Sequence, residues 1–149
     1  MIDEKILKER YDSDMIYALQ LEINDSCHQF CDYCYMKAKT VASQILPSEL
    51  IREILDEAKE LEVSRIEWLG GEPLLRRDVL PLMEYSQKKG LINNMWTGGL
   101  PLASPEIAKR VVEFTQGGLI AFHISSVNKD TYRRLHTEGS ETDLEDILK

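Results

Sequence analysis

The chain has 149 residues, of which 43% are apolar and 30% charged, and its net charge is −8 at pH 7. A membrane-spanning helix needs roughly 20 consecutive apolar residues, which no stretch approaches, and the strongly charged start does not resemble a signal peptide. We therefore expect one globular core domain in the cytoplasm with no membrane partner, and the absence of clustered Lys and Arg argues against nucleic acid as a partner.

Short apolar runs alternate along the chain with longer amphipathic stretches, after a helical extension expected over residues 1–14. The core domain, 15–149, is predicted to contain four units in which a strand is followed by a helix. Asp78 and Ser104 are predicted to cap two of these helices, and Gly90 is predicted to end one. The predicted strands are 15–24, 64–69, 91–96 and 119–124, and the predicted helices begin near 48, 79, 105 and 129, with a further helix starting at 143.

This alternation predicts an α/β fold with a parallel sheet, right-handed crossovers and helices on its outer face. Sheets of this kind bind ligands at the carboxyl ends of their strands. The unusual segments of this sequence follow the predicted strands, so four loops are expected to converge on one site. In chain order they are a cysteine-rich loop, Gly70-Gly71-Glu72-Pro73, Thr97-Gly98-Gly99 and Ser125-Ser126-Val127-Asn128.

The three cysteines, Cys27, Cys31 and Cys34, lie within eight residues of one another, and their odd number does not suit a disulfide framework. Clustered thiolates favour zinc or an iron-sulfur cluster. A zinc site needs a fourth protein ligand, for which His123 or His136 is available, whereas a 4Fe-4S cluster held by three cysteines leaves one iron open to a small molecule. Three unconnected buried thiols are the remaining alternative.

The spacing Cys-x-x-x-Cys-x-x-Cys, with Tyr33 before the third cysteine and Gly-Gly-Glu-Pro after the second strand, resembles the radical S-adenosylmethionine (radical SAM) enzymes over roughly residues 15–135. The resemblance implies that the three cysteines ligate a 4Fe-4S cluster whose open iron is chelated by S-adenosylmethionine. It also implies that Gly70, Gly71 and Glu72 bind the methionine amino group and that Tyr33 lies near the adenine. The fold implied is a partial (β/α) barrel of the radical SAM type, with about four β-α units in this chain.

The resemblance further implies that an electron donor such as flavodoxin or ferredoxin reduces the cluster. S-adenosylmethionine is then cleaved to a 5'-deoxyadenosyl radical that abstracts hydrogen from a substrate. Thr97-Gly98-Gly99 resembles the threonine-asparagine-glycine turn of many relatives, with Gly98 in place of the asparagine. After the fourth strand, Ser125 and Asn128 are the expected cofactor contacts, with Ser126 as the alternative to Ser125.

The Gly-Gly-Glu-Pro-Leu-Leu sequence and the general strand pattern resemble most those radical SAM members that modify peptides or proteins or build cofactors, which implies such a role with the substrate itself unidentified. Two competing hypotheses are a zinc-binding module that docks a partner protein and an iron-sulfur protein without catalytic activity. A closed barrel takes ~250 residues, so we expect the open sheet edge to be covered by the rest of a longer chain or by a second copy. His136 and the pair Arg76-Arg77 are expected on solvated helix surface.

Overall fold

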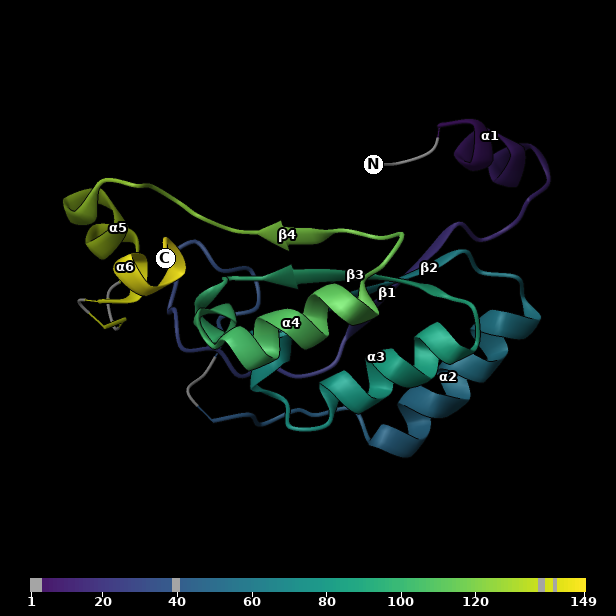
Figure 1. The fold of residues 1–149 in the computed structure, drawn as a ribbon, viewed down its shortest axis with the longest axis horizontal. Coiled ribbons are helices and arrows are strands. Elements are labelled where there is room, and N and C mark those ends of the chain that lie inside the picture. Colours follow the sequence, from purple (N-terminus) through teal and green to yellow (C-terminus); the bar gives the residue numbers. More distant parts are fainter. Residues whose placement is uncertain (1–3, 39–40, 137–138, 141) are drawn as a thin grey trace.

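Four parallel strands form the centre of the molecule, in the order in which they occur in the sequence. The structure is a computed structural model and describes residues 4–38, 41–136, 139–140 and 142–149. The expected α/β fold is confirmed, and an open sheet of this order is one part of a barrel (Figure 1). The strands are β1 (Ala18–Glu22), β2 (Arg65–Leu69), β3 (Ile92–Thr97) and β4 (Ile120–Phe122).

Helices α2, α3 and α4 lie on one face of the sheet, and α5 and α6 lie beyond the carboxyl ends of the strands (Figure 1). Helix α1 stands at the opposite end of the molecule from α5, and no described helix is long and apolar enough to cross a membrane. The helices are α1 (Glu4–Asp12), α2 (Ser48–Glu60), α3 (Val79–Lys88), α4 (Pro105–Phe114), α5 (Lys129–Leu135) and α6 (Asp143–Ile147), with the short 3-10 helices η1 (Pro73–Leu75) and η2 (Leu100–Ala103).

The core lies between the sheet and helices α2 to α4, where alternate residues of the strands are buried. Trp68 and Met95 are fully buried here together with apolar residues of the three helices. Asn93 shares this face and is also fully buried. It accepts a hydrogen bond from the Trp68 indole and donates to the carbonyls of Met83 and Phe114, so its amide is satisfied within the core.

The first predicted strand is too long. The prediction began at Met15 and ended at Asn24, whereas β1 pairs with β2 only from Ala18 to Glu22. Asn24 instead forms an isolated antiparallel bridge with Ile45. Alternation in the sequence therefore continues beyond the partner strand that is available for pairing.

The two predicted helix caps occupy the expected positions but do not cap with their side chains. Asp78 and Ser104 precede α3 and α4, and neither side chain accepts a hydrogen bond from the helix. Gly90 follows the last residues of α3 with a left-handed φ of 82°, so the predicted helix end is confirmed.

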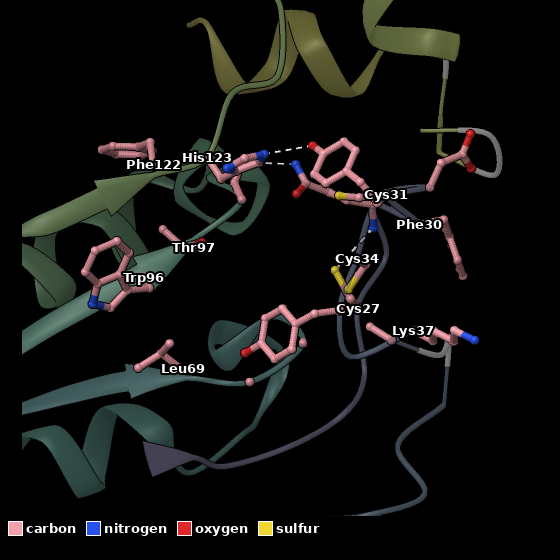
Figure 2. Close-up of a pocket in the computed structure, with 18 of the residues that line it drawn as sticks. Cys27, Phe30, Cys31, Cys34, Lys37, Leu69, Trp96, Thr97, Phe122 and His123 are labelled. Atoms are coloured by element: carbon pink, nitrogen blue, oxygen red, sulfur yellow. Dashed lines mark hydrogen bonds between the residues drawn. The ribbon is translucent and has the colours of Figure 1, made fainter. Parts of the chain in front are cut away.

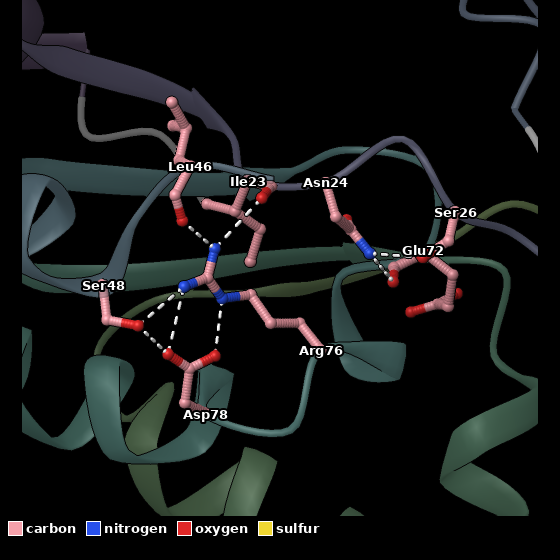
Figure 3. A network of polar contacts seen from close by, with 8 residues as sticks. All are labelled: Ile23, Asn24, Ser26, Leu46, Ser48, Glu72, Arg76 and Asp78. Atoms are coloured by element: carbon pink, nitrogen blue, oxygen red, sulfur yellow. Dashed lines mark hydrogen bonds and ion pairs between the residues drawn. The ribbon is translucent and has the colours of Figure 1, made fainter. Parts of the chain in front are cut away.

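The prediction that Arg76 lies on solvated surface is wrong. Its guanidinium is buried and donates five hydrogen bonds, which join the end of β1 to the start of α2 and of α3 (Figure 3). The acceptors are the carbonyls of Ile23 and Leu46, the hydroxyl of Ser48 and both carboxylate oxygens of Asp78. Asp78 is thus occupied by this arginine, which explains why it does not cap α3.

Candidate functional site

A cavity of about 730 Å³ opens at the carboxyl ends of β2, β3 and β4. Figure 2 shows the cysteine loop on one side of this cavity and the strand ends on the other. The loop contributes all three cysteines and Tyr33, and the strand ends contribute Gly70, Gly71, Trp96, Thr97, Gly98, Phe122 and His123, among others. The structure therefore brings together six of the nine residues predicted for the site: Cys27, Cys31, Cys34, Tyr33, Gly70 and Gly71.

The three cysteines are free thiols on one wall of the cavity. Cys27 is buried and accepts a 3.5 Å contact from the backbone N–H of Gln29, and Cys31 and Cys34 are half-buried. Cys34 N–H donates to the Cys31 carbonyl at 2.9 Å, which closes a turn between these two thiols. Burial raises the pKa of Cys27 and of Cys31, so their thiolates need a cationic ligand to offset the cost of ionisation.

The donor set suits a cluster better than a single ion. Among the described residues, no three His, Cys, Asp or Glu side chains are grouped so that they could hold one metal ion. An iron-sulfur cluster takes each thiolate at a different iron, so its three ligands do not have to converge on one atom. Three thiols facing a cavity of this volume fit such a cluster.

Gly70 and Gly71 are required by packing within the protein. Gly71 N–H donates to the Asn24 carbonyl at 2.8 Å, and Glu72 N–H donates to the Ser26 carbonyl at 2.7 Å. A Cβ on Gly71 would lie 2.1 Å from that Ser26 oxygen. From the sequence, the glycines were expected to let a ligand approach the backbone closely. The structure shows that they let the segment between β1 and Cys27 approach it closely.

Glu72 does not line the cavity. Its side chain is fully buried, and its carboxylate accepts hydrogen bonds from the Thr97 hydroxyl and from the backbone N–H groups of Gly98 and Leu74. Burial raises the pKa of Glu72, while these three donors act in the opposite direction. The carboxylate therefore braces the turn after β3 against the turn after β2.

Tyr33 connects the cysteine loop to the segment that follows β4. Its hydroxyl lies 2.7 Å from His123 Nε2 and is in hydrogen-bond contact with Ser125 Oγ. Burial raises the pKa of Tyr33, so the phenol is neutral at ordinary pH. Tyr33 thus lines the cavity from the cysteine loop and reaches across to the segment that follows β4.

Ser125 and Asn128 lie outside the cavity lining, although both were expected to contact a cofactor. Ser125 contacts Tyr33 and His136, at 2.9 Å from the Nε2 atom of the latter. Asn128 caps α5 by accepting a hydrogen bond from Thr131 N–H at 3.0 Å, and Ser126 accepts from the Asn128 N–H. The helix cap gives Asn128 a structural task.

The wall opposite the cysteines is largely apolar. Leu69, Trp96, Ala121 and Phe122 lie at the ends of three adjacent strands. Trp96 is partly exposed, and its indole N–H donates to the buried Glu67. This wall can pack against a nucleoside or another flat, apolar group.

Gln29 lines the cavity and His136 contacts Cys31 beside it; the sequence offered His136 only as an alternative fourth ligand for zinc and did not single out Gln29. His136 was expected on the surface, yet it is only 4% exposed and its Nδ1 atom lies 3.4 Å from Cys31 Sγ. The buried side chain of Gln29 donates to the Gly98 carbonyl and to the Tyr132 hydroxyl. These three contacts span 105, 103 and 69 positions of the sequence, so no local pattern marks them.

Comparisons with known proteins show which family and which fold this chain shares. A family model described as the Radical SAM superfamily matches residues 21–149. Probable GTP 3',8-cyclase of Thermoplasma volcanium is 27% identical over 123 residues, which cover 80% of this chain and 36% of that protein. PqqA peptide cyclase of Streptomyces rochei is 31% identical over 100 residues, or 64% of this chain and 28% of that protein. The chain thus spans about a third of the length of these curated relatives.

Solved structures share the fold. The structure of Streptococcus suis SuiB bound to S-adenosylmethionine has a TM-score of 0.68 at 17% identity, covering 98% of this chain and 34% of that one. A structure of anSMEcpe with bound AdoMet has a TM-score of 0.65 at 18% identity, covering 89% of this chain and 39% of that one. At these identities the likeness concerns the fold alone.

Proposed function

We propose that this chain, which belongs to the radical SAM superfamily, forms the cluster-binding part of an enzyme that cleaves S-adenosylmethionine reductively. The observation that carries the proposal is the set of three free thiols on one wall of a cavity whose other walls are glycine-rich turns and apolar side chains. Cys27, Cys31 and Cys34 would hold a 4Fe-4S cluster. The chemistry that such a cluster supplies, once reduced by a donor such as flavodoxin or ferredoxin, is one-electron cleavage of a carbon–sulfur bond.

The task of the residues around the cavity is to orient S-adenosylmethionine and to exclude water. The apolar wall at Trp96 and Phe122 and the ring of Tyr33 offer surfaces for the adenosine. The backbone at Gly70 and Gly71 faces the cavity, so we assign recognition of the methionine amino group to this backbone. Glu72 contributes indirectly, because its carboxylate holds the turn that carries Thr97.

The remaining assignments are proposals as well. Residues 15–149 would form the radical SAM core and 1–14 a helical extension, with the enzyme in the cytoplasm. The unpaired edge of β4 would be covered by the rest of a longer chain or by a second copy of this one. The relatives that cyclise GTP or the PqqA peptide, and the structure of SuiB bound to its precursor peptide SuiA, support a substrate in peptide modification or cofactor biosynthesis.

Anaerobic reconstitution tests the proposal. The wild-type chain should take up iron and sulfide in a ratio typical of 4Fe-4S and, with dithionite and S-adenosylmethionine, should yield 5'-deoxyadenosine by mass spectrometry. Cys31→Ala should lose both the cluster and the product. Ser104→Ala is the matched control, because this serine lies outside the cavity and its side chain caps no helix.

The same experiment separates the two competing hypotheses. Zinc bound without iron or sulfide would contradict the proposal and favour a structural metal module. An intact cluster without any 5'-deoxyadenosine would contradict the cleavage activity and favour an iron-sulfur protein that keeps the fold.

A further inference from the structure

His136 directly follows α5 and lies against the cysteine loop. The backbones of Cys31 and His136 form an antiparallel bridge, and Asp32 N–H donates to the Leu135 carbonyl at 3.0 Å. The imidazole Nδ1 atom lies 3.4 Å from Cys31 Sγ and 3.1 Å from the Gln29 carbonyl oxygen. The helix end is therefore attached to the middle cysteine by both backbone and side chain.

The surroundings of the ring determine which nitrogen carries the hydrogen. The Gln29 carbonyl can only accept, so Nδ1 carries a hydrogen whether the ring is neutral or charged. That hydrogen is shared between the Gln29 oxygen and the Cys31 sulfur. At the other nitrogen, Nε2, the Ser125 hydroxyl at 2.9 Å donates to a neutral ring.

The orientation of the ring is also fixed. Tyr132, one helical turn earlier, stacks on the His136 ring with centroids 4.1 Å apart and an interplanar angle of 20°. The Tyr132 hydroxyl in turn receives a hydrogen bond from the Gln29 side chain. With His136 only 4% exposed, water cannot easily replace the imidazole as the donor to Cys31.

We propose that His136 is a positioning residue of the cluster, whose Nδ1–H donates to the Cys31 thiolate and favours the reduced state. The inference rests on the proposed function, because it concerns Cys31 as a cluster ligand. A hydrogen bond to a coordinating sulfur withdraws negative charge, and the reduced cluster carries one negative charge more than the oxidised cluster. The donor therefore stabilises the reduced cluster more and raises its potential.

A pair of amide variants tests this donor without emptying the site. In His136→Asn the amide nitrogen takes the place of Nδ1, whereas in His136→Gln it takes the place of Nε2. EPR-monitored redox titration without S-adenosylmethionine should give His136→Asn a potential near that of the wild type. His136→Gln should have a lower potential, by up to a tenfold change in the reduction equilibrium, about 59 mV for one electron.

Ser104→Ala is the control, because this serine lies outside the cavity and its side chain caps no helix, and its potential should equal that of the wild type. Equal potentials for His136→Asn and His136→Gln would overturn the inference and leave the proposed function intact. Absence of iron and sulfide from the wild-type chain would overturn the proposed function and this inference together.

A measurement on the cluster-free chain provides a second, independent test. Long-range ¹H–¹⁵N spectra of the imidazoles report which ring nitrogen carries hydrogen. We expect the Nδ1–H tautomer for His136 and its partial loss in Ser125→Ala, which removes the donor to Nε2. An Nε2–H tautomer in the wild type would contradict the assignment of His136 as a donor to Cys31, whatever the cluster content.

Discussion

Replacing Arg76 by Met removes the buried guanidinium and keeps most of the side-chain volume. All five of its N–H groups donate, to the carbonyls of Ile23 and Leu46, to Ser48 and to both oxygens of Asp78 (Figure 3). Breaking a buried ion pair costs 3–5 kcal/mol, but Asp78 is 38% exposed and regains water, and Ile23 keeps a second donor. We therefore expect a loss of about 2–4 kcal/mol in the free energy of unfolding.

The same substitution should change the response to acid. The Arg76 guanidinium lowers the pKa of Asp78 to about 2, below the ordinary value of 3.8. Ionised Asp78 thus stabilises the folded chain above pH ~4, and this stabilisation is lost as the pH falls toward 2. Because the carboxylate is partly exposed and screened, its contribution is about 1 kcal/mol. In Arg76→Met the part of this acid sensitivity that the guanidinium causes should disappear, whereas the Ser48 hydroxyl still donates to Asp78.

Urea unfolding at pH 7 and at pH 3, followed by circular dichroism, measures both effects. Arg77→Met is the matched control, because it removes the same charge from the neighbouring, exposed position and should change stability by less than about 0.5 kcal/mol. Equal shifts of the urea midpoint for the two variants, or an unchanged acid response in Arg76→Met, would show that the buried network does not stabilise the fold as argued.

Substitutions of Gly71, Glu72 and Tyr33 probe the walls of the cavity and the buried carboxylate that supports one of them. Gly71→Ala places a Cβ 2.1 Å from the Ser26 oxygen and should lower the free energy of unfolding by about 3 kcal/mol or more. Gly117→Ala is the control, because Gly117 has a left-handed backbone but no atom within 4 Å of the added Cβ, and it should cost about 1 kcal/mol. Equal urea midpoints for the two variants would refute the packing argument. In Glu72→Gln a side-chain NH₂ replaces a carboxylate oxygen that accepts a hydrogen bond, so two donors meet in a buried place. This variant should lose about 1–3 kcal/mol in the free energy of unfolding, measured in the same assay. Tyr33→Phe should bind S-adenosylmethionine to reconstituted protein within a few-fold of wild type, whereas Tyr33→Ala should bind about tenfold more weakly, and equal binding by the two would exclude ring stacking.

The strands and helices could be predicted because their signals are local. Alternating apolar residues and helix-start residues each lie within a single element, and the regular geometry of a strand or helix then places the apolar residues on one face. Strand ends could not be predicted in this way. Tyr17 continues the alternation of β1, but pairing with β2 begins only at Ala18, opposite Arg65. The length of a strand depends on where its partner begins, and a single stretch of sequence does not contain that information.

The same distinction applies to the site. The cysteine spacing is a local motif, and the cavity lies at the carboxyl ends of the strands, where it was predicted. His136, however, meets Cys31 across 105 positions, and Arg76 gathers carbonyls from two other segments. A histidine or an arginine in a polar stretch is most often solvated, so composition alone pointed to the surface. Burial of these side chains follows from how the elements pack, which becomes evident only in the folded chain.

Glu72 illustrates why loss of activity in a variant of this motif does not by itself identify a ligand contact. Its carboxylate is fully buried and holds Thr97 and Gly98, which line the cavity, while the carboxylate itself does not. A variant that loosens this brace displaces the cavity wall and weakens binding without any direct contact having been lost. Binding and stability therefore have to be measured together. Loss of a direct contact lowers affinity at unchanged stability, whereas loss of a supporting contact lowers both, and the three donors to Glu72 lead us to expect the second result.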